Sequence, residues 1–276
     1  MTRSILMAAL LILSADLVLA QQQKGRIVFE RVTQIKIAIA TTNGEPNEAL
    51  QNMLPKTRTD RFELSFNNGQ SIWKQLEDEQ PDGDNAIFNN GGGGMMIRTM
   101  SVGSEDVTFS NIEIGRKIEL RELGTKKYIV EDSLLKLKWK LSEETKTILG
   151  QLCRKATSER ISTRMMMNMD NGKMERKEVA DTTQITAWFS MSIPVSAGPA
   201  EFQGQLPGMI LELENGRSHF AAVEISEKVD LASIKEPKGP KRITTAEFNK
   251  ERDKMFEEMG RNSGGGAGRT VIRIGN

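Results

Sequence analysis

The chain has 276 residues, with 38 Lys or Arg against 37 Asp or Glu and a formal net charge of +1 at pH 7. Nucleic-acid binders usually carry a basic excess on one face, and no charge run here supplies one, so this class of function is disfavoured. Cys153 is the only cysteine, which excludes an intrachain disulfide and leaves packing to hold the fold.

The first twenty residues are typical of a secretory signal peptide. Arg3 precedes an apolar run from Ile5 to Leu19, and the small residue Ala20 ends it before Gln21. We expect cleavage after Ala20 and export to the periplasm or beyond. A retained membrane anchor is the alternative, but the run is short for a span and Asp16 would lie inside it. No later segment is apolar for long enough to span a membrane as a helix.

Alternation of apolar and polar residues recurs from residue 25 to residue 225 and indicates strands with one buried face. The first alternating apolar positions are Ile35, Ile37, Ile39, Phe62, Leu64 and Phe66. Asn67-Asn68-Gly69 predicts a hairpin turn, because an Asn-Gly pair tolerates positive φ, and a strand carrying Ile72 and Leu76 follows. Gln80 to Gly94 predicts a flexible loop. Its run Gly91 to Gly94 lacks the residues of a phosphate-binding loop.

The strongest alternation runs from Leu135 to Leu141, where leucines and a tryptophan face the core and the lysines between them face solvent. Glu143 to Ala156 is ambiguous between helix and strand, and its pattern favours strand. Arg164 to Lys177 is polar and rich in methionine, so we expect a long hairpin tip. A further strand is predicted over Ile185 to Ile193. Met209 to Leu213, the turn Glu214-Asn215-Gly216 and Phe220 to Ile225 predict a second hairpin.

The C-terminal region changes character. Pro237 to Pro240 is expected to end the sheet, and Thr244 with Glu247 three residues later forms a capping box that starts a helix. The apolar face of this helix consists of Phe248, Met255, Phe256 and Met259, and Gly260 closes it. Ser263 to Gly268 is a flexible tether. Beyond it, Val271, Ile272 and Ile274 could add a strand in the same molecule or in a partner.

The sequence therefore predicts four segments. These are a signal peptide over 1–20, an antiparallel β domain over 21–235, a C-terminal helical segment over 236–262 and a Gly-rich flexible tail over 263–276. The predicted fold is mainly β, a single curved antiparallel sheet or incomplete barrel with the C-terminal helix packed on it. A β-sandwich is the alternative.

Short motifs in this order resemble the GLPGLI family, a group of exported bacterial proteins. They include Gly25 to Arg31, Lys138-Trp139-Lys140, Cys153 to Ala156, Ala187-Trp188-Phe189, and the segment from Ile193 to Leu211. The positions that the resemblance singles out are Trp139, Cys153, Trp188, Pro194, Gly198, Pro199, Leu206, Pro207 and Gly208. Gln205 stands where the name-giving motif begins with glycine, and Gly204 is a candidate to make that turn. The resemblance implies export and no established molecular function.

The Gly-Pro and Leu-Pro-Gly elements are interpreted as a rigid bend that leads into a core strand, with ligand contact as the alternative. His219 is the only histidine and has no local motif that links it to Cys153. We therefore expect no enzyme and no cofactor. Cys153 is interpreted as a small buried hydrophobe, with a reactive or partner-bonded thiol as the alternative.

Methionine is the unusual residue type, with 15 in the chain. Thioethers are soft ligands, so Met165, Met166, Met167 and Met169 form a candidate Cu(I) site. Adaptable contact with a protein or lipid is the alternative.

The predicted function is that of an exported, non-enzymatic binding or accessory protein of the bacterial periplasm or outer-membrane periphery. Its partner would be an envelope or outer-membrane protein. The alternative is a carrier that binds Cu(I) through the loop methionines or a lipid within the curved sheet. The sequence leaves the oligomeric state open.

Overall fold

The structure is a computed structural model that describes residues 23–34, 56–76, 85–88, 95–98, 106–170 and 173–262. The predicted signal peptide, the strand expected around Ile37, the run Gly91 to Gly94 and the tail from Ser263 lie outside the described residues. Within the described part of the chain, no helix combines the length and apolarity needed to cross a membrane.

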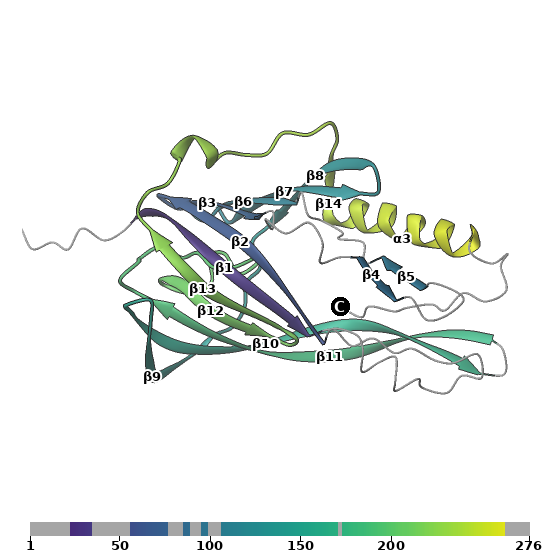
Figure 1. The fold of residues 1–276 in the computed structure, drawn as a ribbon, viewed down its shortest axis with the longest axis horizontal. Helices are drawn as coiled ribbons and strands as arrows, with labels where there is room; N and C mark the ends of the chain where they lie inside the picture. The colour runs from purple at the N-terminus through teal and green to yellow at the C-terminus, as the bar shows by residue number, and fades with distance from the viewer. Residues whose placement is uncertain are drawn as a thin grey trace, which may run out of the picture.

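Twelve strands form one large curved sheet, drawn in Figure 1. In the order in which they lie side by side they are β14 (Arg242–Thr244), β8 (Lys126–Ser133), β7 (Arg116–Leu123), β6 (Val107–Asn111), β3 (Gln70–Gln75), β2 (Thr57–Asn67), β1 (Lys24–Gln34), β13 (Ser218–Ser226), β12 (Met209–Asn215), β11 (Lys173–Ser190), β10 (Gln151–Asp170) and β9 (Lys140–Ile148). Only the β14–β8 pair among them is parallel. The strand order ends at β14 and β9 without closure into a barrel. The predicted mainly β fold with one curved, open sheet and a C-terminal helix is therefore confirmed.

One face of the sheet carries the main core. Alternate residues of five strands are buried there, namely Ile27, Phe29, Leu64, Phe66, Ile185, Ala187, Phe189, Leu211, Leu213 and Phe220. The connection between β11 and β12, residues 191–208, packs Ile193, Phe202 and Leu206 against this face. We call this connection the covering segment. Burial of each such side chain is worth about 1.5–3 kcal/mol relative to exposure. The apolar-polar alternation in the sequence thus arises because one face of the sheet is buried.

Two predicted turns and one favoured strand assignment are confirmed. Asn68 and Gly69 join β2 to β3 with φ of 43° and 76°. Gly216, with φ of 60°, lies in the turn between β12 and β13. The ambiguous segment from Glu143 to Ala156 is strand, as favoured, but Leu149 and Gly150 turn it into the β9–β10 hairpin.

The strand predicted over Leu135 to Leu141 is wrong. Residues 134–139 form no strand, β9 begins at Lys140, and the Leu141 residue is 53% exposed. Leu137 and Trp139 do pack against the core, which explains the alternation. Side chains, and not a neighbouring strand, provide hydrogen bonds to the backbone of this segment. For example, Ser158 Oγ donates to the Lys138 carbonyl over 2.9 Å.

One predicted loop needs correction. Part of the loop expected over Gln80 to Gly94 is β4 (Asn85–Phe88), which pairs with β5 (Met95–Arg98) in a separate two-stranded sheet. The hairpin expected over Arg164 to Lys177 is confirmed, and its strands β10 and β11 continue until only residues 171 and 172 fall between them.

The C-terminal helix α3 (Thr245–Asn262) begins at the predicted capping box. Glu247 N–H donates to Thr244 Oγ1 over 3.2 Å, and Thr244 N–H donates to the Glu247 carboxylate over 2.8 Å. Phe248 packs against Tyr128 of β8, with ring centroids 5.8 Å apart. The helix continues two residues past the predicted stop at Gly260. The sheet does not end at Pro237 to Pro240, because β14 follows and pairs with β8.

Candidate functional site

The β10–β11 hairpin extends far beyond the rest of the sheet, as Figure 1 shows. β10 pairs with β9 only as far as Thr157, and β11 pairs with β12 only from Ile185 onward. Residues 158–170 and 173–184 therefore pair only with each other within the described part of the chain. We call this two-stranded segment the arm. At about 3.3 Å per residue it reaches about 40 Å.

The base of the arm is fixed to the body by polar contacts. Besides the Ser158 bond to Lys138, Arg160 pairs with Glu201 over 2.8 Å. Gln184 Nε2 donates to the Glu159 carboxylate across the hairpin over 2.9 Å. Further out, Ile161 is 77% exposed, which is unusual for a residue of its size. The arm therefore leaves the body from an anchored root and presents apolar surface to solvent.

Both outer edges of the arm have no neighbouring strand in the described structure. Half of the backbone groups of an edge strand point away from its partner, and such an edge is a template for pairing with an added strand. A two-stranded ribbon is also only marginally stable alone. The arm is therefore a candidate interaction element.

The predicted Cu(I) residues lie in this arm. Met165, Met166, Met167 and Met169 belong to β10, and the register pairs Met169 with Met174 of β11. Their side chains lie outside the described residues, so the Cu(I) site stays a prediction.

Two glutamines organise the segment that carries the Gly-Pro and Leu-Pro-Gly elements. The Gln203 residue is 1% exposed, accepts from Ser71 Oγ of β3 over 3.0 Å and donates to the Gly198 carbonyl. Gln205 Oε1 accepts from Leu137 N–H and from the indole N–H of Trp139, each over 3.2 Å, and its amide donates to the Leu135 carbonyl. Gln205 thus attaches residues 135–139 to the covering segment.

The glycines of this segment allow backbones to approach closely. A Cβ at Gly198 would lie 2.8 Å from the Phe202 carbonyl oxygen, and one at Gly208 would overlap the carbonyl of Ser190. Gly204 has a φ of 70°, the left-handed conformation expected for the residue beside Gln205. Leu206 is buried, while Pro207 is exposed. These positions shape a bend that leads into β12, as the rigid-bend interpretation describes.

The remaining singled-out residues lie on several elements. Pro194 and Pro199 belong to the covering segment, and Trp139 packs partly against the core. Cys153 is fully buried, and burial raises the pKa of its thiol to about 11. Such a thiol stays protonated at neutral pH and is a poor nucleophile. Two ammonium groups approach the Trp188 ring, with Lys146 Nζ 4.3 Å and Lys155 Nζ 5.9 Å from its centroid.

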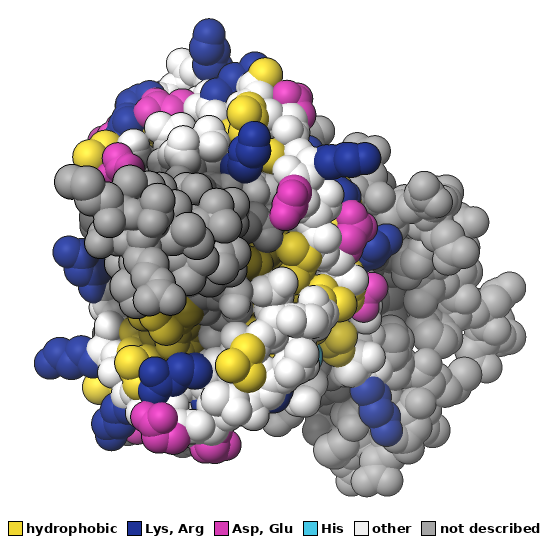
Figure 2. Space-filling model, turned by 90° about the vertical axis from the view of Figure 1, so that its left-hand side faces the viewer, with side chains coloured by type: hydrophobic (Ala, Val, Ile, Leu, Met, Phe, Trp, Pro, Cys, Tyr) yellow, Lys and Arg dark blue, Asp and Glu magenta, His cyan; other side chains and the backbone are white. Residues whose placement is uncertain are grey.

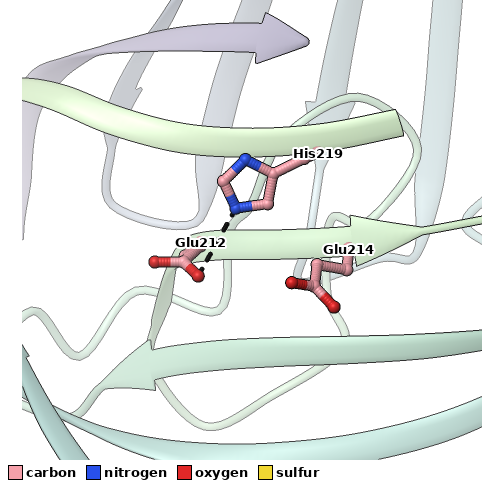
Figure 3. A group of neighbouring side chains, drawn as sticks. All are labelled: Glu212, Glu214 and His219. Carbon is pink, nitrogen blue, oxygen red and sulfur yellow. Dashed lines mark ion pairs between the residues drawn. The ribbon is translucent and has the colours of Figure 1, made fainter. Parts of the chain in front are cut away.

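The sequence reasoning missed one cluster, shown in Figure 3. Glu212 and Glu214 of β12 lie beside His219 of β13, and one ligand atom from each lies within 4.8 Å of the others. His219 Nε2 is 3.4 Å from Glu212 Oε1, which also accepts from Lys146 Nζ over 2.7 Å. The hairpin was predictable, but its loop is Gly216-Arg217, and this register is what pairs Glu214 with His219.

Among the described residues, no strand pair extends from the opposite end of the sheet as the arm does. Figure 2 views the end that lies away from the arm, and apolar side chains there lie among charged ones of both signs. Such mixed surface is ordinary for a folded protein.

The structure defines the class of this chain as a mainly β protein with one large open sheet. Over residues 139–212, less than half of its length, the chain matches a family described as "Protein of unknown function (Porph_ging)". The matched stretch includes Trp139, Cys153, Trp188 and the bend, but it does not confirm the name GLPGLI. No curated protein matches the chain.

Two solved structures are similar to the chain. One is PNGF-II in space group C2, at 16% identity and a TM-score of 0.43, covering 81% of this chain and 32% of that one. The other is PNGF-II in space group P21, at 16% identity and a TM-score of 0.47, covering 84% of this chain and 34% of that one. The chain thus spans about a third of the length of these neighbours.

Proposed function

We propose that this chain is an exported, non-enzymatic binding or accessory protein of the bacterial periplasm or outer-membrane periphery, and that its arm contacts an envelope protein partner. The observation that carries the proposal is the arm itself, whose two strands, within the residues that the structure describes, pair only with each other over about 40 Å. The signal-peptide pattern of the first twenty residues supports export.

The physical argument concerns the backbone edges. Strand addition satisfies edge N–H and C=O groups with main-chain hydrogen bonds, and side chains next to the added strand supply specificity. Arg160, Lys173 and Lys177 place positive charges along the arm. Lysines on edge strands discourage indiscriminate pairing, which suits a binding element that must remain selective.

The experiment shortens the arm without changing its register. Residues 161–170 and 173–182 are deleted, so that Asn171-Gly172 joins Arg160 to Thr183. These two residues already pair with each other, as Asp170 and Lys173 do beside the natural turn. The shortened chain should keep its unfolding midpoint, because the deleted residues lie outside the strands of the sheet body, and Ile161, Ala180 and Thr182 among them are exposed.

Native mass spectrometry of the protein purified gently from its own envelope reads the result. We expect the parent chain to carry an additional protein mass and the shortened chain to lack it. The control is the variant with Met165, Met166, Met167 and Met169 replaced by leucine, which keeps the arm at full length and should keep the partner. A bound mass that survives the shortening, or a parent chain with no bound protein, contradicts the proposal.

A Cu(I) carrier is the second candidate. The observation that favours it is the cross-strand pairing of Met169 with Met174, next to three further methionines on β10. Leucine preserves the bulk of methionine but removes the soft sulfur. Copper uptake that is unchanged in the four-leucine variant rules this candidate out.

A further inference from the structure

The Glu212, Glu214 and His219 cluster lies on the sheet body, outside the arm, so its chemistry does not depend on the proposed function. We propose that these three side chains form a binding site for a divalent transition-metal ion of the Zn²⁺ class. His219 would bind through Nε2 and each glutamate through one carboxylate oxygen. A water molecule would complete a four-coordinate site.

The spacing of the ligand atoms supports this assignment. Zn²⁺ binds nitrogen and oxygen at about 2.0–2.2 Å, so two ligands of a tetrahedral site lie about 3.3–3.5 Å apart. His219 Nε2 and Glu212 Oε1 are already 3.4 Å apart, which is longer than an ordinary charged hydrogen bond. No pair of ligand atoms is separated by more than 4.8 Å. A rotation within the Glu214 side chain therefore suffices to complete the site.

The backbone holds the three ligands on one side of the sheet. Glu214 is the direct cross-strand partner of His219, and Glu212 lies two residues earlier on the same strand. Alternate residues of a strand share a face, and directly paired residues face the same way. The β12–β13 hairpin thus places all three side chains on one face of the sheet before any ion arrives.

The ammonium group of Lys146 contacts a carboxylate oxygen that the metal ion would bind. This ammonium group pairs with Glu212 and lies over the Trp188 ring. An incoming ion would release the ammonium from the carboxylate, while the aromatic face still offers it a favourable position. The ion and Lys146 therefore compete for Glu212. Removal of the lysine should strengthen metal binding, an effect that a purely structural ion pair would not produce.

The test uses the untagged protein as isolated from its own cells, because a histidine tag would bind the ion. Isothermal titration with ZnCl₂ near neutral pH should show one site per chain. Glu212→Gln, Glu214→Gln and His219→Gln should each weaken binding by more than about tenfold. Glu224→Gln, which removes the same charge from β13 outside the cluster, should not, and Lys146→Met should tighten binding. MgCl₂ should give no comparable binding, since Mg²⁺ prefers an octahedral shell of oxygen atoms.

A second readout does not depend on how well each variant folds. His219 is the only histidine, so the imidazole ¹⁵N spectrum of the parent contains one pair of signals. Zn²⁺ should shift the Nε2 signal and fix the ring as the tautomer protonated at Nδ1. Unchanged ring signals at saturating Zn²⁺, or equal Zn²⁺ affinity in Glu214→Gln and the parent, would overturn the site.

Discussion

Gln205 is the side chain on which the covering segment most depends. Its single amide serves Leu137 N–H, the Trp139 indole and the Leu135 carbonyl, none of which has a strand neighbour. We expect Gln205→Ala to lower the free energy of unfolding by about 1–3 kcal/mol, because partly buried donors and acceptors lose their partner. Urea unfolding measures this. Gln184→Ala, which removes an exposed bond to Glu159, is the matched control and should cost less than about 0.5 kcal/mol.

Gly208 tests whether the bend is rigid. An added methyl group would overlap the Ser190 carbonyl, a backbone atom that cannot move aside without displacing β11. Gly208→Ala should therefore destabilise the protein by about 3 kcal/mol or more. Gly115→Ala separates crowding from backbone strain, since Gly115 has open space but a φ of 65°, and should cost only about 1 kcal/mol. Equal losses in thermal unfolding would show that the bend yields.

Cys153 should behave as a buried hydrophobe. Burial raises its pKa from 9.0 to about 11, so folding favours the neutral thiol. Its contribution to stability is complete below pH 9 and declines as the pH rises toward 11. Iodoacetamide at pH 8 should label the native thiol far more slowly than the urea-unfolded one. Cys153→Ala should flatten the loss of stability above pH 9, and rapid native labelling would contradict the assignment.

At the scale of elements, the α3 cap is the most local test. Thr244 supplies both the hydroxyl that accepts from Glu247 N–H and the N–H that Glu247 accepts. Thr244→Ala should lower stability by about 1 kcal/mol. The bonds from Thr244 lower the Glu247 pKa, so this contribution is present above pH 4.5 and weakens as the pH falls. Thermal unfolding at pH 7 and pH 4 checks both, and a smaller effect at pH 7 would be inconsistent with the cap.

The elements also show where sequence patterns suffice. Turns at Asn68-Gly69 and the capping box depend on neighbouring residues, so the sequence predicts them well. The apolar alternation of residues 134–139 wrongly predicts a strand. One buried side gives the same sequence pattern whether the backbone hydrogen bonds go to Gln205 or to a neighbouring strand. The three-residue β14 carries no pattern at all. Of the candidate metal site, the sequence predicts the hairpin but not the register that pairs Glu214 with His219. The approach of Lys146 from β9 depends on the strand order.

At the scale of the whole molecule, the sheet is open and its two ends are treated differently. At one end, β14 and α3 lie on β8, where Ile243 and Phe248 are buried. At the other, β9 is exposed over most of its length but carries charged residues such as Glu143, Glu144 and Lys146, which discourage further pairing. The arm extends away from the body of the sheet. Within the described residues its two strands pair only with each other, so packing of the main core does not explain their length.

Photo-crosslinking in living cells tests whether the arm contacts a partner. A photoreactive amino acid replaces Ile161, which lies in the arm, or Ile114, which is similarly exposed at 66% in the turn between β6 and β7. We expect a discrete crosslinked protein from position 161 and none from position 114. The same products from both positions, or no product from position 161, would show that the arm does not bind a partner.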